Sequence, residues 1–128
     1  MTFLNDNTLD NGLSALKAAA DKVYICSAEP ATFTAATSTL ALGNKNFGAG
    51  AVYPAAIAAG TPSGRQLVTA AITDGTVTGT GTASHYAVTT TASSRLELAN
   101  SLSATQAVTS GNTFTLGAAT LRLPNIGG

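Results

Sequence analysis

The clearest pattern in the chain is an alternation of residue types over residues 76–88 (TVTGTGTASHYAV). One set of alternate positions holds mostly Thr and the other holds mostly Val, Gly and Ala, and a period of two predicts one long β-strand. Thr is β-branched and suits a pleated surface, whereas Gly and Ala leave room for a close neighbour. Gly79, Gly81 and Ala83 therefore predict a closely packed strand face, and the preceding pair Asp74-Gly75 predicts a hairpin turn.

A helical pattern occupies the N-terminal part of the chain. Over residues 7–21 the apolar residues recur at intervals of three or four, which predicts one amphipathic helix. Asn7 can cap its first turn, and Lys17 lies toward its last turn, where the helix dipole favours a cation. We expect the apolar face to pack on a β core, and this face carries Leu9, Leu13, Leu16, Ala20 and Val23.

Shorter strand patterns follow along the rest of the chain. Residues 95–102 (RLELANSL) fit either a strand or a short helix, because their leucines satisfy both periods. Ser110-Gly111-Asn112 predicts a hairpin turn, and the apolar parity changes near Gly117, which predicts a β-bulge or a break. The remaining expected strands are residues 23–27, 65–72, 106–110, 113–116 and 121–123. One helix and six or seven strands predict a mainly β fold, an antiparallel β-sandwich or barrel with one N-terminal α-helix.

The 128 residues correspond to one domain, residues 1–128. We divide it into an arm and helix (residues 1–22), a β core (residues 23–124) and a tail (residues 125–128). Within the core, residues 43–64 contain five glycines and two prolines and have no sustained period, which predicts a long loop. Its apolar residues anchor it either on its own core or on another subunit, and because they are few we expect chiefly the second. The candidate partner-contact residues are Phe3, Leu4, Phe47, Val52, Tyr53 and Ile57.

Charge narrows the possible partners. Charged residues make up 9% of the chain and the net charge is zero, against about 25% charged residues in an ordinary soluble domain. Without a basic patch, nucleic acid binding is not expected. No apolar run approaches the roughly 20 residues of a membrane helix, and no signal peptide is visible, so we expect no membrane contact and synthesis in the cytoplasm. Near-zero net charge promotes association, which favours a homo-oligomer.

Side chains suited to catalysis or to metal binding are scarce, because the chain has one His and one Cys, and it has no Trp. We expect His85 to be a structural or surface residue, and Cys26, which follows an apolar run, to be a small buried hydrophobe. Residues 6–12 are faintly similar to a calcium loop, but Lys17 stands where the bidentate Glu is required. The sequence therefore predicts no enzyme, no catalytic residue, no cofactor and no metal ligand.

Four segments together resemble small structural proteins encoded in the morphogenesis regions of tailed bacteriophages and prophages. They are residues 22–30 (KVYICSAEP), 63–65 (SGR), 75–86 (GTVTGTGTASHY) and 108–123 (VTSGNTFTLGAATLRL). The resemblance implies a non-enzymatic virion component made in the host cytoplasm. The leading expectation is a capsid decoration (cement) protein that stabilises the head lattice through the major capsid protein or other virion proteins.

Two alternatives remain open from the sequence. One is a tail, collar or fibre component involved in host attachment. The other is a carbohydrate-binding β-sandwich module, which is weakened by the absence of Trp and by an aromatic content of 5%.

Overall fold

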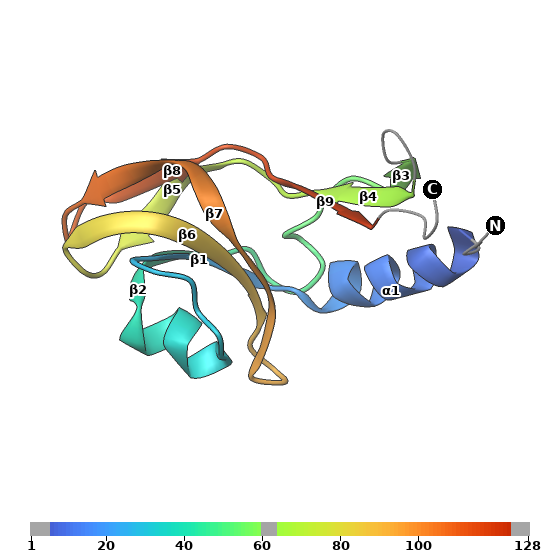
Figure 1. Ribbon diagram of the computed structural model, residues 1–128, viewed down its shortest axis with the longest axis horizontal. Coiled ribbons are helices and arrows are strands. Elements are labelled where there is room, and N and C mark those ends of the chain that lie inside the picture. The colour runs from blue at the N-terminus through green and yellow to red at the C-terminus, as the bar shows by residue number, and fades with distance from the viewer. Residues whose placement is uncertain (1–5, 60–63, 124–128) are drawn as a thin grey trace.

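The protein is mainly β, as the alternating pattern predicts, with one N-terminal helix and an open, curled antiparallel sheet that forms a half-barrel (Figure 1). The computed structural model describes residues 6–59 and 64–123. Within these residues the six-stranded sheet has the order β7-β6-β1-β2-β5-β8, and a smaller sheet has the order β3-β4-β9. The elements are α1 (Asp6–Ala19), β1 (Lys22–Cys26), the π-helical turn η1 (Ala35–Thr39), β2 (Ala41–Asn46), β3 (Ala58–Ala59), β4 (Arg65–Val68), β5 (Ile72–Val77), β6 (Gly81–Thr90), β7 (Arg95–Val108), β8 (Thr113–Leu116) and β9 (Thr120–Leu123).

β1 lies in the interior of the large sheet, between β6 and β2, and is buried on both faces. Val23 and Ile25 belong to the main hydrophobic core. Tyr24 and Cys26 point to the opposite face, where they form a second cluster with Ala36 of η1. A strand with two covered faces has a continuous apolar run instead of an alternation, which accounts for the sequence VYIC.

Helix α1 packs on the β structure as its spacing predicts. Leu13 is 1% exposed and belongs to the main core, and the half-buried Leu16 packs against it. The Lys17 ammonium donates a hydrogen bond to the carbonyl oxygen of Tyr53 at 2.7 Å. Near the other end of the helix, Asp10 forms an ion pair with Arg65 of β4, also at 2.7 Å. The side chain of Leu9 lies outside the described residues.

The long strand predicted over residues 76–88 is wrong. β5 ends at Val77 and β6 begins at Gly81, and the pair Asp74-Gly75 lies inside β5 instead of forming a hairpin turn. Gly75 is needed for close packing, because a Cβ atom built there would lie 2.3 Å from the ring of Phe114.

The predicted close packing of small residues on a strand is confirmed at Gly81 and Ala83 of β6. A Cβ atom at Gly81 would lie 3.2 Å from the side chain of Leu42, and Ala83 is 1% exposed. Gly79 lies between β5 and β6, and a Cβ atom there would lie 3.6 Å from Leu42, an ordinary contact distance.

Residues 43–64 are organised differently from the predicted long loop. Residues 43–46 belong to β2, and Ala58–Ala59 form β3. Val52 and Tyr53 are both 0% exposed within the main core, and the amide of Ala70 donates to the carbonyl of Val52 at 2.9 Å. Residues 43–59, the described part of this segment, are therefore held by the subunit's own core, because two fully buried anchors and backbone hydrogen bonds fix them there.

The C-terminal strands form in part as predicted. Arg95–Val108 is a single strand, which decides between the two alternatives for residues 95–102. The turn at residues 109–112 is present, with Gly111 at φ +91°, but the predicted hairpin is wrong because β7 and β8 do not pair with each other. The predicted break at Gly117 is confirmed, since β8 ends at Leu116 and the chain continues into β9 of the other sheet.

Candidate functional site

The two edges of the large sheet are β7 and β8, and we define the seam as the gap between β7 and residues 115–120. β7 and β8 are consecutive in the chain but lie at opposite edges of the sheet. A turn of four residues joins them, so the sheet has to curl until the end of β7 and the start of β8 lie near each other. The turn is fixed on β5, because the amide of Gly111 donates to the carbonyl of Val77 and the amide of Val77 donates to that of Asn112, both at 3.0 Å.

Away from this turn the seam opens into a groove. In the pairing of β6 with β7, residues 102–105 lie opposite the single residue Ser84. Such an irregularity bends a strand and increases its local twist, so β7 turns away from β8. On the other side the chain leaves β8 after Leu116 and crosses to β9. The two walls therefore diverge (Figure 1).

The groove has a volume of about 390 Å³. Residues 100–104 and Gln106 of β7 form one wall, residues 115–120 form the other, and Tyr86 of β6 contributes from the sheet between them. Leu102 and Leu116 are half-buried and pack against the main core, so the groove has apolar as well as polar surface. Its size falls in the range of about 300–1,000 Å³ that is typical of small binding sites.

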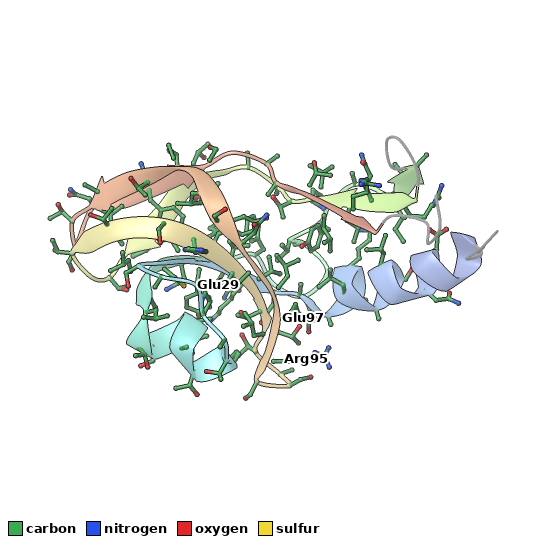
Figure 2. All side chains as sticks on the ribbon, in the orientation of Figure 1. Glu29, Arg95 and Glu97 are labelled. Carbon is green, nitrogen blue, oxygen red and sulfur yellow. The ribbon has the colours of Figure 1, made fainter. Side chains whose placement is uncertain are left out.

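None of the residues that line the groove is charged. The ion pairs found in the described part of the chain lie elsewhere, for example between Lys45 and Asp74 on β2 and β5. Arg95 pairs with Glu97 near the first residues of β7 (Figure 2), and neither residue lines the groove. The groove therefore offers hydrogen bonds and apolar contacts and no charged side chain.

Both walls of the groove begin as unpaired strand edges. Among the described strands, β7 pairs only with β6 and β8 pairs only with β5. Each strand consequently leaves one row of backbone N–H and C=O groups without a strand partner. Such an edge is a template for pairing with a further extended segment.

The arrangement around His85 does not form a catalytic group. The Ser84 hydroxyl lies 2.8 Å from Nδ1 of His85, and it donates to the carbonyl of Ser27 at 2.9 Å. A serine hydroxyl has one proton, so a hydroxyl that donates it to a carbonyl has none to give to the imidazole, as a nucleophile must. In the residues that the structure covers, no three His, Cys, Asp or Glu side chains gather into a possible metal site.

Cys26 is a buried hydrophobe, as predicted. It is 0% exposed, and its thiol lies 3.6 Å from the carbonyl oxygen of Ala36. Burial raises the pKa of the Cys26 thiol to about 11. A thiol that stays protonated near neutral pH is a weak nucleophile and a weak metal ligand.

The predicted partner-contact residues that the structure describes do not line the groove. Val52 and Tyr53 are in the subunit's own core and are not available to a partner, which corrects their assignment. Phe47 and Ile57 are half-buried and pack against that core. Phe3 and Leu4 lie outside the described residues.

Sequence reasoning missed the groove itself. Residues 98–121 contain no charged residue, although they include most of an edge strand. Charged side chains commonly protect an edge strand from pairing with another chain. The uncharged run was therefore the sequence feature that could have indicated an unprotected edge.

No protein family, curated protein or solved structure that was compared matches this chain. Among the described helices, none has the length and apolar character needed to cross a membrane.

Proposed function

We propose that the protein is a non-enzymatic structural subunit of a tailed-phage virion, and that it decorates the capsid and stabilises the head lattice. The observation that carries the proposal is the uncharged groove between two unpaired strand edges. A surface of this kind suits the binding of a protein segment. The four segments that resemble phage morphogenesis proteins support the same class of function.

The chemistry of the described residues is consistent with this class. The one histidine has a serine neighbour that is unsuited to act as its nucleophile, and the one cysteine is buried. An assembly subunit needs a surface that a partner can cover, and the two unpaired edges of the open, curled sheet support this requirement. The major capsid protein and further copies of this chain are the partners that we propose.

Quantitative mass spectrometry of purified particles tests the proposal. A decoration protein should be present at a copy number comparable to that of the major capsid protein. A few copies per particle would favour the alternative of a tail, collar or fibre component. Absence from particles that contain the other virion proteins would contradict both.

A reconstitution experiment separates decoration from mere presence. Particles produced without this gene should lose their DNA at a lower temperature than complete particles do. Added purified chain should restore the higher temperature if it binds the outside of the head. A chain with Ala104→Lys, which places a charge in the groove, is the matched variant and should restore less. Particles whose heat resistance does not depend on the chain would contradict a cementing role.

A further inference from the structure

We infer that the free edge of β7, which forms one wall of the groove, pairs with β7 of a second copy of this chain. The two strands run antiparallel about a two-fold axis at Ser103 and join two large sheets into one continuous sheet. The inference rests on the proposed function only in naming a further copy of the chain as a partner, and it specifies where and in which register that copy binds.

Residues 98–108 of β7 (LANSLSATQAV) carry the same kinds of side chain in either direction from Ser103. Going outward from it, the matched positions are Leu102 and Ala104 (aliphatic), Ser101 and Thr105 (hydroxyl), Asn100 and Gln106 (carboxamide), Ala99 and Ala107 (identical), and Leu98 and Val108 (aliphatic). Pairing with β6 does not require this symmetry, because the sequence of β6 (GTASHYAVTT) lacks it.

An antiparallel pair of identical strands converts the symmetry into contacts. Its two-fold axis places each residue opposite the residue at the same distance on the other side of the axis. With the axis at Ser103, hydroxyl groups face hydroxyl groups, carboxamides face carboxamides, and aliphatic side chains face each other. Matched cross-strand pairs of this kind stabilise a sheet. An axis at Ala104 would instead place Leu102 opposite Gln106, so the sequence favours one register.

β7 is accessible for this pairing. Residues 103–107 are five consecutive exposed positions, whereas a strand with one face on a core alternates between buried and exposed positions. Residues 102–105 lie opposite the single residue Ser84, and β7 pairs with no described strand except β6. The walls of the groove diverge beside these residues (Figure 1). An added strand can therefore form main-chain hydrogen bonds along this edge.

The distribution of charge permits the two-fold contact. An axis that passes through a strand brings each residue near the axis close to its own copy, so a charge there would meet the same charge. Like charges directly opposite each other destabilise a sheet. Residues 98–121 contain no charged residue, so no such repulsion arises along the paired segment.

The inferred contact is isologous, because both copies use the same surface, and it closes with two copies. A ladder of residues 98–108 is a small contact, and small contacts are typical of weak complexes. We therefore expect a monomer at about 1 μM and an increasing fraction of dimer toward about 1 mM.

Engineered cysteines test the position of the axis. In Ser103→Cys the two thiols lie directly opposite each other, at a Cα separation of about 5 Å that a disulfide can bridge. Mild oxidation should link this variant into a dimer. Ala107→Cys, on the same strand, is the matched control, because its two copies would lie about 26 Å apart and should not link. The native Cys26 is buried and should stay unmodified.

A second cysteine pair tests the register. Ser101→Cys and Thr105→Cys should each fail to link with its own copy, since identical residues would lie about 13 Å apart. A mixture of the two variants should give a disulfide between the two different chains. The inference is wrong if Ser103→Cys links no better than Ala107→Cys, or if the mixture links no better than the separate variants.

Opposite charges at the axis provide an independent measurement. Ser103→Lys and Ser103→Glu each place two like charges opposite each other, so each should raise the dissociation constant about tenfold or more in light scattering. A mixture of the two should form a one-to-one pair, because the charges across the axis are then opposite. Ser38→Lys, at an exposed position on η1, is the control and should leave the dissociation constant unchanged.

A native chain that remains monomeric at about 1 mM would overturn the inference. Dimers that persist in Ser103→Lys would do so as well, as would a mixture of the two charged variants that stays monomeric. Circular dichroism confirms that each variant is folded, and the small cysteine substitutions keep the test decisive if a charged variant is not. All these measurements use the free chain in solution, whereas the copy number in purified particles tests the proposed function, so the two can fail separately.

Discussion

At the scale of single residues, Gly75 and Gly12 differ in whether the structure has room for a larger side chain. A Cβ atom at Gly75 would meet the ring of Phe114, which is 2% exposed and cannot move without disturbing the core. A Cβ atom at Gly12 would meet nothing within 4 Å, and this glycine lies inside α1. We expect Gly75→Ala to lower the free energy of unfolding by about 1–3 kcal/mol. Gly12→Ala should raise it by about 1 kcal/mol, and urea denaturation of both variants measures the difference.

Cys26 gives a prediction about pH. Its pKa is raised by burial from 9.0 to about 11, so the unfolded chain releases the thiol proton at a lower pH than the folded chain. The stability that this thiol contributes is fully present below pH 9 and is lost as the pH rises toward 11. Cys26→Ala should show a smaller decrease in melting temperature across this interval. An equal decrease in both proteins would contradict the role given to Cys26.

At the scale of elements, the packing of α1 can be tested through its buried face. Leu13 is 1% exposed in the main core, whereas its neighbour Ser14 is exposed. Leu13→Ala should destabilise the fold by about 2–5 kcal/mol, because it leaves a cavity between the helix and the sheet. Ser14→Ala is the control and should stay within about 0.5 kcal/mol of the native chain. A denaturation midpoint unchanged by Leu13→Ala would mean that α1 does not pack on the core.

Periodicity predicts the elements whose pattern is set locally. The spacing of Leu13 and Leu16 predicts α1, and the change of parity at Gly117 predicts the end of β8. Periodicity fails over residues 78–80, where the alternation of Thr and Gly continues although the strand does not. There the amides of Thr78 and Gly79 both donate to the carbonyl of Leu42, a contact that no local pattern specifies.

At the scale of the whole molecule, the pairing of strands could not be read from the sequence. A turn of four residues between β7 and β8 predicts a hairpin. In the structure this turn instead connects the two opposite edges of the sheet, because its backbone hydrogen bonds are made with Val77 of β5. The groove depends on this closure and on the irregularity of β7 opposite Ser84. Both are long-range pairings, and neither leaves a period in the sequence.

The burial of Val52 and Tyr53 makes a further prediction for the whole subunit. Because both are 0% exposed, residues 47–57 should resist limited proteolysis in the free chain. The exposed turn at residues 91–94 should be cut before residues 47–57 are. Tyr53→Ala should make the segment sensitive while the sheet remains folded. First cleavage within residues 47–57 of the native chain would show that its own core does not hold this segment.

Hydrogen exchange at the groove tests the central claim, that the seam between the sheet edges is the surface used in assembly. In the free chain, peptides covering residues 100–106 and 115–120 should exchange faster than those of β1, which is paired on both sides. In intact particles, the same two regions should become protected while β1 changes little. Equal exchange of these regions in the free chain and in the particle would contradict the claim.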